Sequence, residues 1–224
     1  MKKRSSVILA LFLVLGYGIY IFFLAPVVRE RAAVRNIELR DVDLLGLTDG
    51  VYHGAYVDGT YEVEVVVADH RIAAIHMLIT RDSDYARQAE GVLDSVVEAQ
   101  SLQVDVVSGA TTTSKAILKA VEDALHSPPN EPYISGIIHT KEENRILVVE
   151  GIESEDLEQE QWLEEGYEAI WLTVKTDTAV IAPEGKAAHG AALQKGQNVQ
   201  AWVVGLILDS YPAQSTAGLI IIRE

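Results

Sequence analysis

Residues 105–114 read Asp105-Val106-Val107-Ser108-Gly109-Ala110-Thr111-Thr112-Thr113-Ser114, which places five hydroxyl side chains around a Gly-Ala pair. An apolar stripe at helical spacing follows directly, formed by Ala116, Ile117, Ala120, Val121, Ala124 and Leu125. This spacing predicts an amphipathic helix whose N-cap is Thr113 or Ser114. The first N–H groups of a helix lack internal partners and lie at the positive end of its dipole, so the stretch is suited to hold a phosphate.

Gly109 and Ala110 would let a phosphate approach the backbone closely, because they carry little or no side chain. The stretch is not a P-loop, since the pattern G-x-x-x-x-G-K-[ST] is missing. Composition alone therefore leaves an ordinary capped loop as the simpler interpretation. A hydrolytic nucleophile would need a neighbouring base, and none of the six histidines stands in such a pattern. The sequence predicts no catalytic residue, and it predicts no metal site because motifs such as H-E-x-x-H are missing.

The sequence upstream of this stretch predicts an antiparallel meander followed by a helix. The expected strands are Val51–Val57, Tyr61–Val67 and Ile72–Ile79. Asp58-Gly59 is a strong signal for a two-residue hairpin turn, and Asp69-His70 marks the next turn. Apolar residues at helical spacing then predict a helix over 89–100. The Pro-rich segment 127–132 ends the second helix and has the composition of a linker.

Residues 133–224 carry short apolar segments separated by turn signals. They are Ile134–His139, Ile146–Val149, Ala169–Val174, Val199–Leu208 and Gly218–Ile222. This pattern predicts a small, mostly β domain, an OB-like barrel, interrupted by an acidic helix-like insert over 154–166. The expected fold class is α+β: an N-terminal transmembrane helix, a domain of meander plus two helices over 47–126, and then the barrel.

The N-terminus differs in character from the rest of the chain. Basic residues precede Val7–Val28, a run without charge that would span about 33 Å as a helix, enough for a hydrocarbon core of about 30 Å. We interpret residues 1–28 as an uncleaved signal anchor; a cleaved signal peptide is the alternative. Residues 29–46 would form a juxtamembrane stalk. The expected location is the cell membrane, with a single pass and the C-terminal domains outside the cytoplasm.

The chain of 224 residues has no cysteine and a formal net charge of −15. Disulfides, thiolate metal sites and iron–sulfur clusters are therefore excluded. The acidic balance argues against a nucleic-acid partner, because phosphate backbones require neutralisation by Lys and Arg.

The segment Asp105-x-x-Ser108-Gly109-Ala110-Thr111 resembles the flavinylation motif of the FMN-binding domain family. Ordered matches extend over about 47–126, with Asp49-Gly50-x-Tyr52-x-Gly54, Arg71-Ile72-x-x-Ile75 and Thr113-Ser114-Lys115-Ala116. The family includes the periplasmic C subunit of the sodium-pumping NADH:quinone reductase and the G subunit of the Rnf complex. The resemblance implies FMN joined through its phosphate to Thr111 by a flavin transferase that takes FMN from FAD.

The same resemblance implies roles for the residues around Thr111. Asp105, Ser108, Gly109 and Ala110 would serve recognition by the transferase and placement of the phosphate, and Thr112 and Thr113 would complete the cofactor-binding segment. Tyr52 and Tyr56 have two interpretations, stacking on the flavin ring or packing in the core, and core packing is favoured.

The C-terminal domain resembles a small bacterial extracytoplasmic domain of unknown function. The resemblance rests on Gly196-Gln197-x-Val199-x-Ala201-Trp202 and Ser210-Tyr211-Pro212-Ala213-Gln214, where Tyr211-Pro212 is more simply a turn than a binding lip. The functional expectation is an electron carrier, rather than a stand-alone enzyme, that relays electrons between a membrane donor and an extracytoplasmic acceptor. A non-redox scaffold and a reversible FMN binder are the alternatives.

Overall fold

The computed structural model describes residues 15–21, 34, 37–153, 155, 157–158 and 166–223. The chain divides into two units, Met1–Glu38 and Leu39–Glu224. In the described part of the first unit, residues 15–21 are helical. No helix within the described residues is both long and apolar enough to cross a membrane. Most of the expected membrane segment, residues 1–14 and 22–28, lies outside the described residues.

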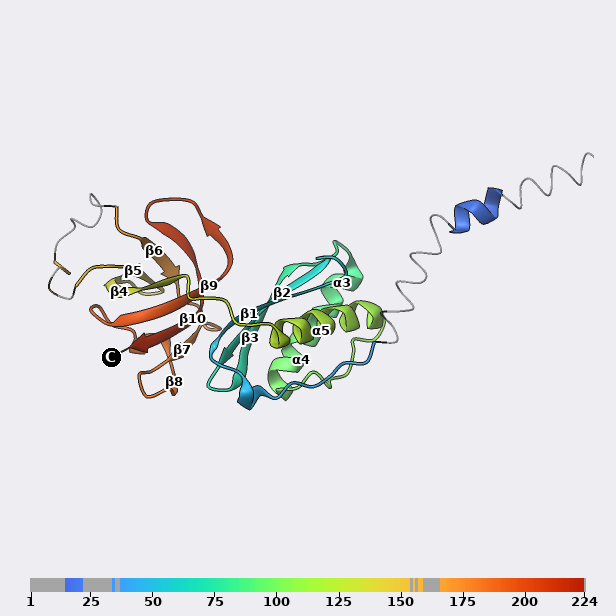
Figure 1. The fold of residues 1–224 in the computed structure, drawn as a ribbon, viewed down its shortest axis with the longest axis horizontal. Coiled ribbons are helices and arrows are strands. Elements are labelled where there is room, and N and C mark those ends of the chain that lie inside the picture. Colours follow the sequence, from blue (N-terminus) through green and yellow to red (C-terminus); the bar gives the residue numbers. More distant parts are fainter. Residues whose placement is uncertain are drawn as a thin grey trace, which may run out of the picture. The chain divides into compact units, whose positions relative to one another are not determined.

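The second unit begins with a three-stranded antiparallel sheet in the order β1-β2-β3, which confirms the expected meander (Figure 1). Its strands are β1 (Gly50–Tyr56), β2 (Tyr61–Ala68) and β3 (Arg71–Ile79). The β1–β2 turn is longer than predicted, because Tyr56 pairs with Tyr61 and four residues lie between them. The tight two-residue turn is instead Asp69-His70, where both residues have positive φ as a type I′ hairpin requires.

Helices cover one face of this sheet. They are α3 (Asp84–Ala89), α4 (Gly91–Ala99) and α5 (Thr111–His126), after a short 3₁₀ turn η2 (Leu44–Gly46) that precedes β1. The two predicted helices are α4 and α5, whereas α3 was not predicted and is capped by the Ser83 side chain. The Gln100 side chain accepts a hydrogen bond from Ile72 N at 2.8 Å and donates one to Ile72 O at 2.9 Å. It thereby covers part of the free edge of β3. Edge strands need such protection, because their unpaired N–H and C=O groups could otherwise pair with another chain.

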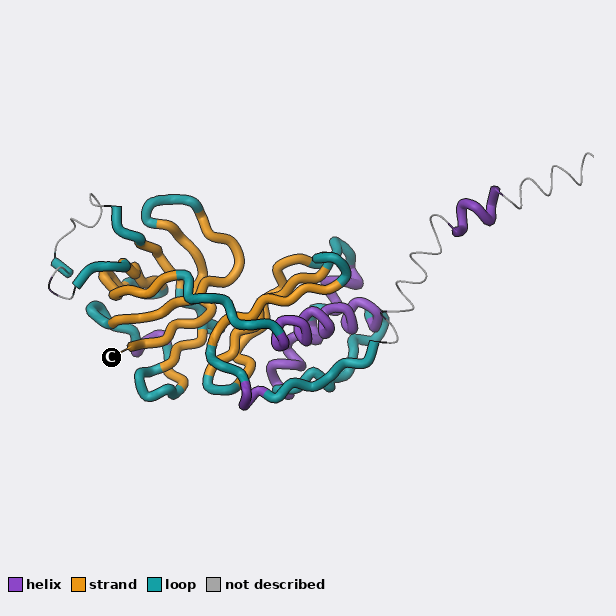
Figure 2. The backbone as a smooth tube through the Cα atoms, in the orientation of Figure 1, coloured by secondary structure: helices purple, strands orange, loops and turns teal. Residues whose placement is uncertain are grey.

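The C-terminal part is a five-stranded barrel, as expected (Figure 2). Its strands are β4 (Ile134–Lys141), β5 (Arg145–Val149), β6 (Ala169–Thr173), β9 (Asn198–Leu208) and β10 (Ala213–Arg223). They run in the order β6-β5-β4-β9-β10, and a parallel pairing of β10 with β6 closes the ring around a core of buried aliphatic side chains. The unpredicted strands β7 (Ala179–Ile181) and β8 (Ala187–Ala188) extend from β10, followed by the 3₁₀ turn η4 (Gly190–Ala192). The predicted insert over 154–166 lies largely outside the described residues.

The barrel packs on the face of the three-stranded sheet that the helices leave open. One apolar cluster contains Val51, Val66, Ala68 and Ala74 from the sheet, together with Ile181, Trp202, Val204, Leu219 and Ile221 from the barrel side. The linker joins the two parts as well: Asn130 N donates to Val51 O at 2.7 Å, and Trp202 Nε1 donates to Asn130 O at 2.7 Å. The sheet and the barrel therefore share this apolar cluster within Leu39–Glu224.

Glu64 on β2 connects the sheet to the barrel, because its Oε2 accepts a hydrogen bond from Gly205 N on β9 at 3.0 Å. Burial raises the pKa of the Glu64 carboxyl above its ordinary value, although the Gly205 amide and the charges of His53 and His76 oppose the shift. The folded state thus binds the proton of Glu64 more tightly than the unfolded chain does. Ionising this carboxyl therefore costs stability as pH rises above about 4.5.

Replacing Glu64 with glutamine should keep the acceptor for Gly205 and remove this cost. We expect Glu64→Gln to gain stability relative to wild type as the pH rises from 4 to 6. This gain in the free energy of unfolding should be less than about 1 kcal/mol, because the Glu64 side chain is partly exposed and solvent screens its charge. Urea denaturation at both pH values measures the effect, and Glu184→Gln on an exposed turn controls for the loss of one negative charge. An offset that is the same at both pH values would contradict the assigned cause.

Candidate functional site: the N-terminus of α5

Helix α5 begins at Thr111 and has Ala110 as its N-cap, without a side-chain cap. The first intrahelical bond runs from Ser114 N to Ala110 O at 2.9 Å. The backbone amides of Thr111, Thr112 and Thr113 have no acceptor among the residues that the structure describes. Three amide donors at the positive end of a helix dipole therefore remain available to an anion.

The predicted N-cap, Thr113 or Ser114, is wrong. Ser114 lies in the first turn of the helix and is completely buried. Its Oγ accepts a hydrogen bond from Val107 N at 3.2 Å. The hydroxyl therefore fixes the preceding loop instead of capping a helical amide, and the helix begins three or four residues earlier than expected.

The loop before α5 closes as a tight turn against the helix. Ala110 N donates to Val107 O at 3.0 Å, and Gly109 has φ of +84°, a left-handed conformation that favours glycine. Ala110 is buried, whereas Ser108 and Gly109 are exposed. The turn thus presents backbone and the Ser108 hydroxyl to solvent directly beside the free amides of α5.

The predicted site residues occupy this loop and the first turn of the helix. Thr111 and Asp105 are exposed, while Thr112 and Thr113 are half-buried. Thr111 is therefore the most accessible of the three threonine hydroxyls. Its position at the start of α5 fits a phosphate group, because a phosphate bound there would face the three free amides.

Helix α3 contributes residues that the sequence did not identify. A side chain on Gly109 would come within 4.0 Å of Gln88 Oε1, so α3 lies beside the turn. Tyr85 is three residues before Gln88, on the same side of the helix, and its side chain is 63% exposed. Arg87 pairs with Asp82 at 3.0 Å and with Asp84 at 2.6 Å. The Ser83 N-cap was the one sequence signal that could have located this helix.

The two tyrosines considered from the sequence both lie on β1. Tyr52 is buried on β1 and its hydroxyl donates to Thr48 O at 2.7 Å, which confirms core packing for that residue. Tyr56 is half-buried at the end of the same strand.

Residues 39–41 bind to the segment that leads into the site loop. Asp41 accepts hydrogen bonds from Leu102 N at 3.0 Å and Ser101 Oγ at 2.8 Å, and Gln103 Nε2 donates to Leu39 O at 2.8 Å. Burial alone would raise the pKa of Asp41, but hydrogen bonds from Leu102, Ser101 and Val42 together hold it below its ordinary value. The N-terminal side of the compact unit thus anchors residues 101–103, a few positions before Asp105.

Ser114→Ala should destabilise the protein by about 1–2 kcal/mol, because it leaves the amide of half-buried Val107 without its acceptor. Urea denaturation gives the stability change, and Ser95→Ala, a half-buried serine on α4 without a side-chain hydrogen bond among the described residues, is the control. Equal stability of the two variants would show that Ser114 does not fix the loop.

Comparison with known families agrees with this geometry. Residues 57–126 match the family described as FMN-binding domain. The chain contains an FMN-binding domain. Residues 135–222, which form most of the barrel, match a family described as a protein of unknown function (DUF3221). Both domains expected from the sequence are therefore present and in the expected order. Among the described residues, no group of three or more His, Asp or Glu side chains is arranged to hold a metal ion.

Two relatives share part of the chain. An uncharacterized protein of Treponema pallidum (strain Nichols) is 43% identical over 86 residues, which cover 37% of this chain and 24% of the relative. A urocanate reductase of Eggerthella lenta is 41% identical over 70 residues, which cover 30% of this chain and 11% of the relative. The matches therefore span about a quarter or less of these relatives. No solved structure matches the chain significantly.

Proposed function

We propose that this protein is a membrane-anchored, extracytoplasmic flavoprotein that carries FMN covalently on Thr111 and relays electrons. The observation that supports it best is the position of Thr111 within the FMN-binding domain: exposed, first in α5, and beside three free amides. The name of one relative describes a reductase, which is in keeping with a redox role.

Attachment would proceed by transfer from FAD, catalysed by a flavin transferase. The Thr111 Oγ1 would attack the phosphorus on the FMN side of the FAD pyrophosphate, so that an O–P bond forms as the P–O–P bridge breaks. AMP would leave, and the hydroxyl proton would pass to a base of the transferase. The transferase would recognise the exposed or tightly turned segment that contains Asp105, Ser108, Gly109 and Ala110.

The residues of this chain would then hold the cofactor in place. Amides of Thr111, Thr112 and Thr113 would bind the phosphate oxygens, and the helix dipole adds about 0.3–1 kcal/mol at an exposed N-terminus. In this proposal the exposed Tyr85 ring, on the same side of α3 as Gln88, would contact the flavin ring. The flavin supplies the electron chemistry, while the protein supplies tether and orientation.

The apolar segment 7–28 would anchor the protein in the membrane, close to an electron donor there. The acceptor would lie outside the cytoplasm. A net charge of −15 favours redox partners with basic docking surfaces, since complementary charge speeds their encounter.

The proposal is tested with the full chain produced in bacteria with and without a flavin transferase. We expect an intact mass increased by one FMN residue only with the transferase, flavin fluorescence that survives denaturing electrophoresis, and reversible reduction of the bound flavin. Flavin that is released on denaturation would instead indicate a reversible FMN binder. Absence of flavin absorbance after co-production would contradict the redox function and favour a scaffold.

A further inference from the structure

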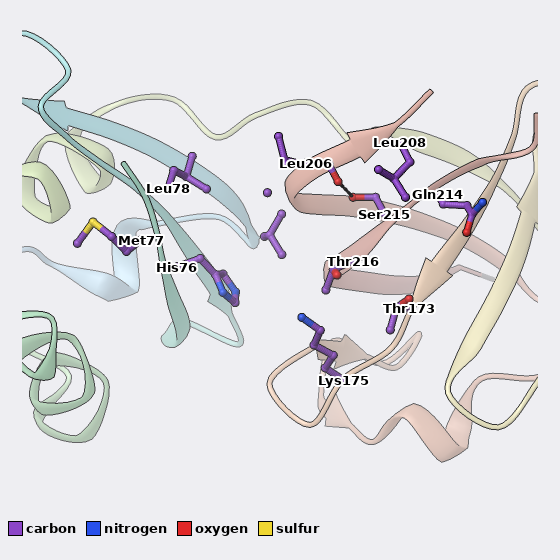
Figure 3. A pocket seen from close by; sticks show the side chains of 12 residues that line it. His76, Met77, Leu78, Thr173, Lys175, Leu206, Leu208, Gln214, Ser215 and Thr216 are labelled. Atoms are coloured by element: carbon purple, nitrogen blue, oxygen red, sulfur yellow. Dashed lines mark hydrogen bonds between the residues drawn. The ribbon is translucent and has the colours of Figure 1, made fainter. Parts of the chain in front are cut away.

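A cleft of about 530 Å³ lies between β3 of the sheet and the barrel, outside the segment that carries Thr111 (Figure 3). Its sheet side is formed by His76, Met77 and Leu78, and its barrel side by residues of β6, β9 and β10 together with Lys175. The volume falls within the range of about 300–1,000 Å³ that small-molecule sites occupy.

One wall of the cleft carries donors without partners. Thr173 and Thr216 are register partners on the parallel strands β6 and β10, so their side chains lie on the same face of the sheet. Neither hydroxyl has a hydrogen bond among the described residues, and neither is among the buried unpaired atoms, so both are open to a ligand. The Lys175 ammonium, which reaches into the cleft in Figure 3, has no ion-pair partner within the described part of the chain.

Apolar side chains line the cleft from both the barrel and the sheet. Leu206 and Leu208 on the outer half of β9 are 88% and 58% exposed, and Leu78 on β3 is also exposed. These side chains line the same cleft as Lys175 and are not covered by described parts of the chain. Exposed apolar side chains gathered around a cleft are typical of ligand-binding or interaction sites.

The walls of the cleft are held in place. Glu64 accepts from Gly205 N at 3.0 Å, and Ser215 Oγ donates to Leu206 O at 3.0 Å, so the outer half of β9 is fixed to both β2 and β10. The Nε2 of His76, which lines the cleft, is buried without a hydrogen-bond partner among the described residues. Buried polar atoms in proteins are usually paired, so this nitrogen is a polar position on the sheet side of the cleft that the described residues leave unsatisfied.

We propose that this cleft binds an amphipathic carboxylate, a molecule with an apolar body and one carboxylate head. The carboxylate accepts hydrogen bonds from Lys175, Thr173 and Thr216, and the body packs on Leu78, Leu206 and Leu208. The ammonium of Lys175 balances one negative charge on the ligand, and the two threonine hydroxyls are neutral donors. A second negative charge on the ligand would be repelled by the chain, whose net charge is −15. A cationic head would face the unpaired ammonium of Lys175.

The test uses isothermal titration calorimetry of the full chain with dodecanoate below its micelle concentration. We expect saturable binding with one site, and binding weaker by about tenfold or more for dodecyltrimethylammonium, which has the same tail and a cationic head. A parallel titration with 2-naphthoate tests a flat aromatic body against the flexible aliphatic one of dodecanoate. The probe that binds more tightly shows which kind of apolar body the cleft prefers.

Variants assign the binding to the cleft. Lys175→Ala and the double variant Thr173→Val/Thr216→Val should each weaken binding about tenfold, whereas Lys186→Ala, an exposed lysine outside the cleft, should leave it unchanged. Circular dichroism verifies that each variant is folded. Absence of saturable binding, equal affinity of Lys175→Ala and wild type, or several weak sites insensitive to the variants would overturn the proposal.

Discussion

Replacing Thr111 with valine is expected to remove covalently bound flavin from the protein completely. Valine keeps the β-branched shape at the first position of α5 but has no hydroxyl to form the phosphoester. Thr111 is exposed, and its side chain has no hydrogen bond to described residues, so the fold should change in stability by no more than about 0.5 kcal/mol. Loss of flavin would then report the attachment site itself and not unfolding.

In-gel flavin fluorescence and intact mass, both after production with a flavin transferase, measure this loss. Thr111→Ser retains a hydroxyl and should keep part of the flavin, while Thr112→Val and Thr113→Val remove the neighbouring hydroxyls and should keep most of it. Their half-buried positions make them poorer acceptors than the exposed Thr111. Full labelling of Thr111→Val, or complete loss in Thr112→Val alone, would place the flavin on a different residue.

The segment around Thr111 shows what a sequence pattern can and cannot define. The apolar stripe after residue 115 correctly predicted α5, because helical periodicity follows from burial of one face. Its first residue was missed, since the Ser114 hydroxyl is used by Val107, seven residues earlier. A capping rule considers only the hydroxyl and the helix. Here the Val107 amide competes for the same hydroxyl, and its position depends on how the preceding loop folds.

The β2 strand shows a second limit. Apolar and acidic residues alternate from Tyr61 to Val65, which is the pattern of a strand with one buried face. In the structure, Val65, Val66 and Val67 are all completely buried. Helices cover one face, and the barrel covers the other near Val66. A continuous Val-Val-Val run is typical of a strand covered on both sides, so the signal was present in the sequence. The partner that covers the second face lies more than a hundred residues away, and only the structure identifies it.

Gly54→Ala is expected to destabilise the protein by about 3 kcal/mol or more. Gly54 lies within β1, where a glycine often marks a close approach of another backbone. A Cβ at this position would overlap the backbone N of Ala124 and the backbone O of Ala120 on α5. Because both obstacles are helix backbone and not the end of a flexible side chain, the whole helix would have to move away from the sheet.

Differential scanning calorimetry should show this as a fall in Tm of about 6–12 °C for a protein of this size. Gly91→Ala is the matched control: it adds the same methyl group at the start of α4, where a Cβ meets nothing within 4 Å, and should be neutral or slightly stabilising. Since α5 also carries Thr111 at its first residue, the displaced helix in Gly54→Ala should accept less flavin than Gly91→Ala under the same transferase. A Gly54→Ala protein with the Tm of Gly91→Ala would show that α5 is free to shift, and would remove the reason for a glycine at this point of contact.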